Sequence, residues 1–86
     1  MIRRSIFECS LDILEAVRKP KILTHIMYES NVNCIILKSL LEDLTKKGLI
    51  TTIEMHRGVP RKHYVLSQKG LDLLCSVRRA AELLQA

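Results

Sequence analysis

Residues 25–48 constrain the fold more than any other stretch of the chain, because they read as two helices joined by a tight turn. The second helix carries leucines at the i, i+3, i+4, i+7 spacing of one apolar face, namely Leu37, Leu40, Leu41 and Leu44. Asn33 is of a type that caps helix N-termini, and Gly48 supplies the left-handed conformation that ends many helices. A short helix, a turn and a capped second helix form the outline of a helix-turn-helix.

The first helix of this pair is predicted to begin at Pro20, because proline suits the first helical position. The turn is expected at residues 30–32, where Asn31 tolerates a left-handed conformation. An earlier amphipathic helix is predicted over residues 4–18, ending before the proline. One face of that helix gathers Ile6, Phe7, Ser10, Ile13, Leu14 and Val17.

After Gly48 the pattern changes from a helical period to strict alternation. Residues 49–56 alternate and are rich in β-branched side chains, which predicts a strand. The glycine and proline within residues 57–61 predict a turn, and residues 62–66 return as a second strand. The hairpin therefore has a basic tip, formed by Arg57, Arg61 and Lys62.

Ser67 is predicted to cap a final helix that runs to about Gln85. Its apolar residues cover more surface than a single buried face needs. Four of them keep the 3-4-3 spacing of a coiled-coil seam: Leu74, Val77, Ala81 and Leu84. This helix either lies in a groove of its own domain or pairs with a second copy, and we favour a dimer interface.

The charge and the cysteines limit the class of protein. Fourteen Lys and Arg residues against nine Asp and Glu residues give a net charge of +5, which favours a polyanionic partner or serves solubility alone. Cys9, Cys34 and Cys75 lack metal-type spacing, so we interpret them as reduced structural residues of an intracellular protein. The sequence shows no signal peptide and no membrane-spanning run, and a cytoplasmic, nucleoid-associated location is expected.

The sequence predicts no enzyme, cofactor or metal site. His56 and His63 could face each other across the hairpin, but no Cys or carboxylate in register completes a zinc site. We also find no nucleophile–base arrangement, glycine-rich phosphate loop or paired carboxylate site.

The predicted fold is mainly α with a small β-hairpin, in the order α-α-α-β-β-α of a winged helix-turn-helix. One domain is expected over residues 1–86, with the helix-turn-helix at about 20–47, the wing at about 49–66 and the C-terminal dimerisation helix at about 67–86. In such folds the third helix enters the major groove of DNA, and the hairpin reaches the flanking backbone or minor groove.

Three blocks of sequence resemble a family of small archaeal winged-helix proteins. Residues 24–33, THIMYESNVN, are similar to its T-x-I-M-Y-x-x-N-L-S block, and residues 47–50 and 64–70 match later blocks. The family includes predicted transcriptional regulators and the ten-kilodalton "ten-a" chromatin proteins. The resemblance implies DNA binding and dimerisation through the last helix, with a shorter dimer contact because the longer tail of the chromatin members is not matched.

The candidate DNA-binding residues are Thr24, His25, Asn33, Ile35, Lys38, Ser39, Arg57, Arg61 and Lys62. Within the second helix of the helix-turn-helix, Ile35 lies opposite the leucine stripe, whereas Ile36 can bend toward the core. Ile35 is open to three interpretations: an ordinary exposed residue, a contact to a thymine methyl group, or a protein contact.

We therefore expect sequence-specific binding of double-stranded DNA by a homodimeric transcriptional regulator. One alternative is a non-specific chromatin-type protein. Another is a winged helix that serves as a protein–protein interaction module, which Ile35, Ile36 and Glu42 on the same surface would suit.

Overall fold

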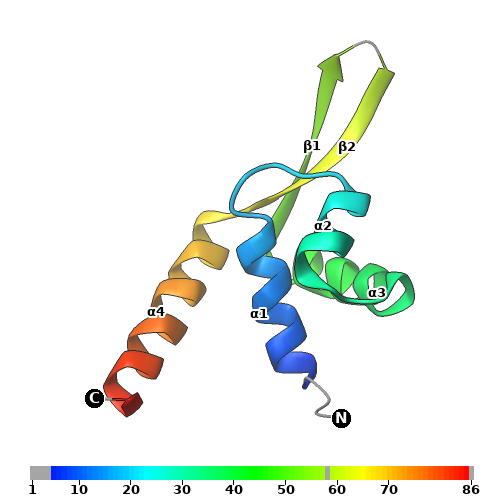
Figure 1. The fold of residues 1–86 in the computed structure, drawn as a ribbon. Coiled ribbons are helices and arrows are strands. Elements are labelled where there is room, and N and C mark those ends of the chain that lie inside the picture. Colours follow the sequence, from blue (N-terminus) through cyan, green and yellow to red (C-terminus); the bar gives the residue numbers. More distant parts are fainter. Residues whose placement is uncertain (1–4, 58, 86) are drawn as a thin grey trace.

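The computed structural model describes residues 5–57 and 59–85, with the backbone alone for residues 55–57, 59 and 60. Within these ranges, four helices and a two-stranded sheet follow one another in the predicted order (Figure 1). The elements are α1 (Ile6–Ala16), α2 (Leu23–Ser30), α3 (Cys34–Lys46), β1 (Ile50–Arg57), β2 (Val59–Leu66) and α4 (Gln68–Gln85).

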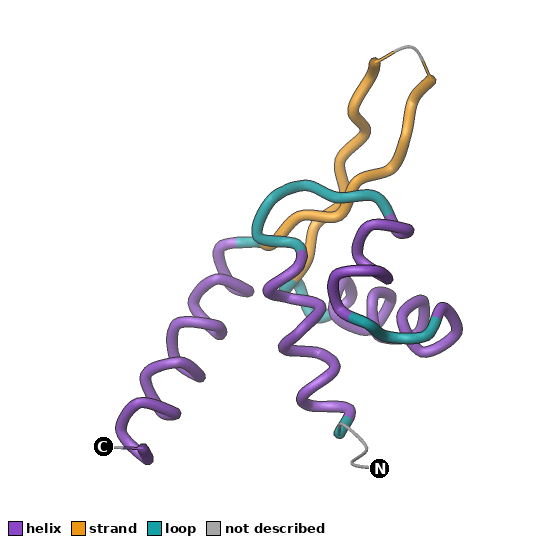
Figure 2. Tube along the Cα trace, viewed as in Figure 1, coloured by secondary structure: helices purple, strands orange, loops and turns teal. Residues whose placement is uncertain are grey.

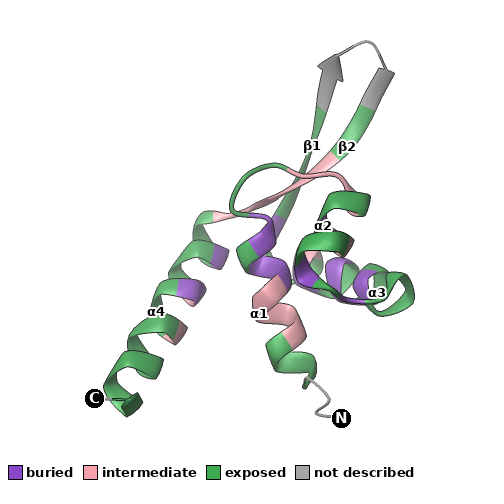
Figure 3. Ribbon diagram, viewed as in Figure 1, coloured by how far each residue is buried: buried purple, intermediate pink, exposed green. Residues whose placement is uncertain are grey.

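The core forms where α1 packs against α2, α3 and α4 (Figure 3). The predicted leucine stripe of α3 is confirmed, because all four of its leucines are buried. They pack with residues from α1, α2, β1 and α4, which include Ile13, Leu14, Val17, Ile26, Ile50 and Leu74. Burying one face of α3 in this way leaves its opposite face to solvent.

The predicted helix caps are confirmed. The Asn33 side chain accepts a hydrogen bond of 3.0 Å from the backbone N–H of Ile36 and so starts α3. Asn31 has the left-handed φ of 54° at the turn between α2 and α3, and Gly48 has φ 77° after α3. The Ser67 hydroxyl accepts from the Gly70 N–H at 3.1 Å and donates to the Gly48 carbonyl at 2.6 Å, which fixes the start of α4 beside the end of α3.

The predicted start of α2 at Pro20 is wrong, because α2 begins at Leu23. The backbone of Lys21 pairs with Tyr64 of β2 through hydrogen bonds of 2.8 and 3.0 Å. This pairing holds Lys21 extended, so the helix can start only after it. Figure 2 shows the resulting loop between α1 and α2 passing across the base of the hairpin.

The hairpin is more extended than predicted. β2 begins at Val59 rather than Lys62, and the register runs from Ile50 opposite Leu66 to Arg57 opposite Val59. In this register His56 lies opposite Pro60 and His63 lies opposite Ile53, so the two histidines do not face each other as they could have done. The hairpin, hereafter the wing, projects away from the helices (Figure 1).

α4 belongs to the core only through its first half. Gly70 is buried so closely against the residue before β1 that an added Cβ would clash with the Leu49 carbonyl oxygen. Further along, α4 diverges from α1 (Figure 1), and an ion pair of 2.9 Å joins Arg78 to Glu15 across the gap. The C-terminal half of α4 therefore has little cover from the described part of its own chain.

The interpretation of the cysteines as structural residues is wrong for two of the three. Cys34 and Cys75 are exposed on α3 and α4, and Cys9 is half-buried on α1. The helical patterns around Cys34 and Cys75 place both on outward faces, away from the other described elements. Of the helices described, none has both the length and the apolar character needed to cross a bilayer.

Candidate nucleic-acid interface

The exposed face of α3 is the first component of the candidate interface. Ile35 is 81% exposed, and this face, hereafter the reading face, consists of Ile35, Lys38, Ser39, Glu42 and Lys46. The face is exposed because the leucine stripe on the other side of the helix is buried in the core. An α-helix with its side chains is roughly 10–12 Å across, which matches the width of the major groove of about 12 Å.

A hollow between α3 and the wing adjoins this face. Leu23 at the start of α2 closes one end, and the remaining lining residues come from α3 and the wing: Lys38, Leu41, Glu42, Thr45, Lys46, Thr52, Lys62 and Tyr64. Three lysines and one glutamate give the hollow a positive balance. Glu42 forms an ion pair of 3.2 Å with Lys46, which offsets part of that balance.

The wing supplies the other basic side chains. Lys62 is exposed at the hollow, with its ammonium 5.2 Å from the centre of the Tyr64 ring. Arg61 is also exposed, but neighbouring residues of a strand project to opposite faces, so Arg61 and Lys62 do not share one side of the wing. Arg57 ends β1 opposite Val59, and its side chain lies outside the described part of the chain.

The other predicted DNA-binding residues lie at the ends of the helices. Thr24 and His25 are exposed in the first turn of α2, next to Leu23 of the hollow. Asn33 uses its side-chain oxygen to cap α3, which leaves its amide nitrogen for other contacts. Of the predicted DNA-binding residues, Lys38 and Lys62 line the hollow, whereas Thr24, His25, Asn33, Ile35 and Ser39 lie outside its lining.

Thr52 and Tyr64, which sequence patterns did not single out, lie opposite each other in the wing and line the hollow. The alternation of the strand could have identified Tyr64. It follows Lys62 by two residues, and residues two apart in a strand lie on the same face. Lys46 also lines the hollow, although its place on the outer face of α3 did not by itself predict a binding role.

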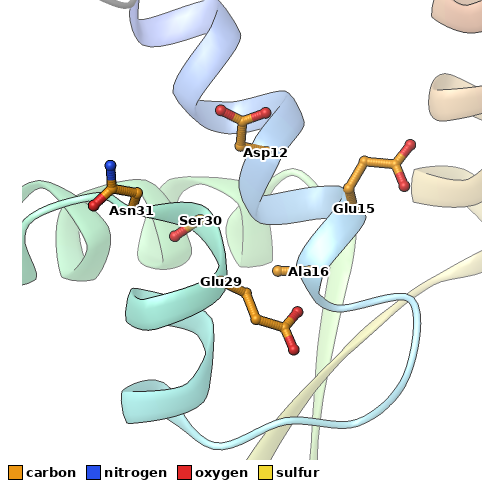
Figure 4. A pocket seen from close by; sticks show the side chains of 6 residues that line it. All are labelled: Asp12, Glu15, Ala16, Glu29, Ser30 and Asn31. Atoms are coloured by element: carbon orange, nitrogen blue, oxygen red, sulfur yellow. The ribbon is translucent and has the colours of Figure 1, made fainter.

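A second hollow, between α1 and α2, is acidic (Figure 4). Its lining residues are Asp12, Glu15, Ala16, Glu29, Ser30 and Asn31. Glu29 pairs with Lys21 at 2.6 Å, and Glu15 pairs with Arg18 and Arg78, so these carboxylates stabilise the surrounding structure. Among the described residues, no three His, Cys, Asp or Glu side chains are grouped as a metal ion requires. Within the described ranges, no lysine or arginine lines this hollow, whereas three lysines line the hollow between α3 and the wing, so the α3–wing side is the candidate interface.

The predicted dimer residues differ in how far the structure exposes them. Leu74 is only 6% exposed and belongs to the core of its own chain, so it is not available to a second copy. Val77 and Ala81 line a groove between α1 and α4, together with Leu11 and Arg78. Leu84, beyond this groove, is 87% exposed.

Comparison with known proteins gives one family match. The winged helix-turn-helix family matches residues 3–85. This agrees with the resemblance to small archaeal winged-helix proteins and with the predicted fold. No curated protein sequence matches the chain.

Several solved structures share the fold. Sso10a-2, a DNA-binding protein from Sulfolobus solfataricus, is 22% identical, with a TM-score of 0.76 over 96% of this chain and 83% of that chain. A PadR family transcription regulator from Clostridium difficile R20291 is 17% identical, with a TM-score of 0.80 over 90% of each chain. A PadR family transcriptional regulator from Eggerthella lenta is 22% identical, with a TM-score of 0.74 over 87% of this chain and 72% of that chain.

Proposed function

The chain belongs to the winged helix-turn-helix family, and we propose that it binds double-stranded DNA sequence-specifically as a homodimeric transcriptional regulator. In this proposal the reading face of α3 enters the major groove and the wing lies on the adjoining backbone. The observation that carries the proposal is the position of Lys38, Lys46 and Lys62 around one hollow between α3 and the wing. The hollow between α1 and α2 supports the same orientation, because no lysine or arginine of the described part of the chain lines it to bind a phosphate.

The residues have distinct roles in the proposed complex. Lys38 and Lys62 contact phosphates, as do Arg57 and Arg61 of the wing, while Thr24 and His25 hydrogen-bond the backbone where α2 crosses it. Ser39 of α3 and the amide of Asn33, the N-cap of α3, contact base edges or phosphates. Phosphate contacts set affinity and register, whereas contacts to bases set the sequence preference.

A salt series tests DNA binding itself. Fluorescence anisotropy with a labelled duplex of about 20 base pairs is expected to show binding at low salt that weakens as salt is added. The slope of log affinity against log salt is expected to be about −0.9 for each phosphate contacted. An absence of binding at low salt would contradict the proposal.

Competition separates a regulator from a non-specific chromatin-type protein. A duplex selected from a random pool by the protein should outcompete unselected DNA by roughly 10³-fold or more if binding is sequence-specific. Equal competition by selected and unselected duplexes would favour the chromatin-type alternative, which the likeness in fold to Sso10a-2 motivates.

The uncovered parts of α1 and α4 support a homodimer. Leu83 and Leu84 are exposed near the end of α4, and Ile6 and Phe7 are exposed at the start of α1. The groove between these helices is lined in part by Val77 and Ala81. We propose that a second copy covers this surface, so that the dimer carries two reading faces.

Light scattering tests the homodimer. The parent chain is expected to have the mass of two chains, and Leu84→Glu is expected to shift it toward one chain by placing a charge in the interface. Leu71→Glu, on the first half of the same helix at a partly exposed position, is the matched control. A monomeric parent chain at high protein concentration would contradict this part of the proposal.

A further inference from the structure

Ile35 is the apolar residue on an otherwise polar reading face. It is 81% exposed, and the remaining residues of that face are Lys38, Ser39, Glu42 and Lys46. The isoleucine side chain cannot donate or accept a hydrogen bond, so it contributes nothing to phosphate binding. Single exposed apolar residues are common on protein surfaces, and the position of Ile35 is therefore what matters.

Ile35 does not line the hollow, but it lies next to a residue that does. Lys38 is three residues further along α3 and Ser39 is four, so both are its neighbours on the helix surface. Lys38 lines the hollow with Lys62 of the wing. Ile35 therefore lies beside the basic surface that would hold the DNA backbone, in the first turn of the helix that would enter the groove.

We infer that Ile35 contacts the 5-methyl group of a thymine in the major groove and so contributes to sequence preference; this inference rests on the proposed function. The thymine methyl is the apolar group that the major groove presents among the four base pairs. In helix-turn-helix proteins, residues at the start of the second helix meet the base edges. An aliphatic side chain at this position gains binding free energy when it covers a methyl group. It gains little binding free energy from a base edge that offers hydrogen bonds.

Ile36 provides a matched comparison on the same helix. It is also an isoleucine, but it is 45% exposed and lies about 100° around the helix from Ile35, on the flank away from the hollow. Ile36→Ala removes the same atoms as Ile35→Ala. In the proposed complex, however, Ile36 faces away from the base pairs.

The experiment compares two duplexes that differ only in methyl groups. One is a duplex of about 20 A·T pairs in mixed order, and the other has deoxyuridine in place of every thymidine. Each A·T pair carries one thymine methyl in the major groove, so every register of binding offers methyl groups to α3. Affinities of the full chain, Ile35→Ala and Ile36→Ala for both duplexes are measured by fluorescence anisotropy at one low salt concentration.

The parent chain and Ile36→Ala are expected to bind the deoxyuridine duplex about fourfold more weakly for each thymine methyl that Ile35 would otherwise cover. Ile35→Ala is expected to bind the thymidine duplex with that same reduced affinity and to show no preference between the two. Any effect of deoxyuridine on the shape of the duplex would persist in Ile35→Ala, so disappearance of the preference reports on the side chain.

Two results would overturn the inference alone: a parent chain that binds both duplexes equally, or an Ile35→Ala variant that keeps the parent's preference. The second result would leave Ile35 free for a protein contact. Failure of the parent chain to bind either duplex would overturn the proposed function and this inference with it.

Discussion

α3 and α4 both carry more apolar residues than one buried face needs, but the fold covers them differently. The leucines of α3 all lie in the core, whereas α4 has Leu74 in the core and Leu84 at 87% exposure. The difference arises because α3 is packed along its length, while α4 diverges from α1 after its first half (Figure 3). Leucine spacing alone does not distinguish a core stripe from an oligomer interface; the elements packed against it do.

The largest difference in stability between variants of the two helices is expected when a leucine is replaced by alanine. Leu37→Ala in α3 should lower the free energy of unfolding by about 2–5 kcal/mol, because Leu37 is fully buried. Leu84→Ala in α4 should change the free energy of unfolding of the monomer by less than about 0.5 kcal/mol. Urea denaturation at low protein concentration measures both, and equal decreases would show that the end of α4 is packed as firmly as α3.

The first half of α4 is expected to be sensitive to substitution where Gly70 meets Leu49, the residue before β1. Gly70→Ala places a methyl group against the Leu49 carbonyl and should cost about 1–3 kcal/mol of the free energy of unfolding. The control is Cys75→Ala, which changes an exposed side chain on the same helix. If thermal denaturation shows both variants to be equally stable, α4 is not held at Gly70 as described.

A smaller effect is expected at the start of α3. Asn33→Ala removes the side-chain oxygen that accepts from the Ile36 N–H and should cost about 1 kcal/mol of the free energy of unfolding. Asn33→Ser keeps a capping oxygen and should restore most of this stability. A serine variant as unstable as the alanine variant, measured by urea denaturation, would show that capping is not what Asn33 contributes.

Local patterns in the sequence predicted much of this fold. The leucine stripe of α3, the caps at Asn33 and Ser67 and the left-handed residues Asn31 and Gly48 each depend on neighbours close to them in the chain. For the same reason the order of helices and strands was predictable. The bounds of elements depend less on such neighbours, and the predicted starts of α2 and β2 were wrong.

Several of the errors share a physical cause, which is contact between separate elements of the fold. The start of α2 is set by the pairing of Lys21 with Tyr64, and the register of the wing decides which residues face each other. The burial of Leu74 depends on how closely α4 approaches Leu49 and Leu66 at Gly70. The hollow itself is formed by four separate elements, α2, α3, β1 and β2, so Thr52 and Tyr64 could be placed in it only once the elements were assembled.

The most direct test of the central proposal, that DNA binds at the α3–wing side, compares two double variants of equal charge. Lys38→Ala with Lys62→Ala removes two lysines from the hollow, and Lys19→Ala with Arg79→Ala removes two exposed cations from elsewhere. Both reduce the net charge by the same amount. We predict that the log–log salt slope of duplex binding becomes shallower by about 1.8 for the first pair and hardly changes for the second. The proposal would be contradicted if the salt slope changed equally for both double variants, or changed more for the second.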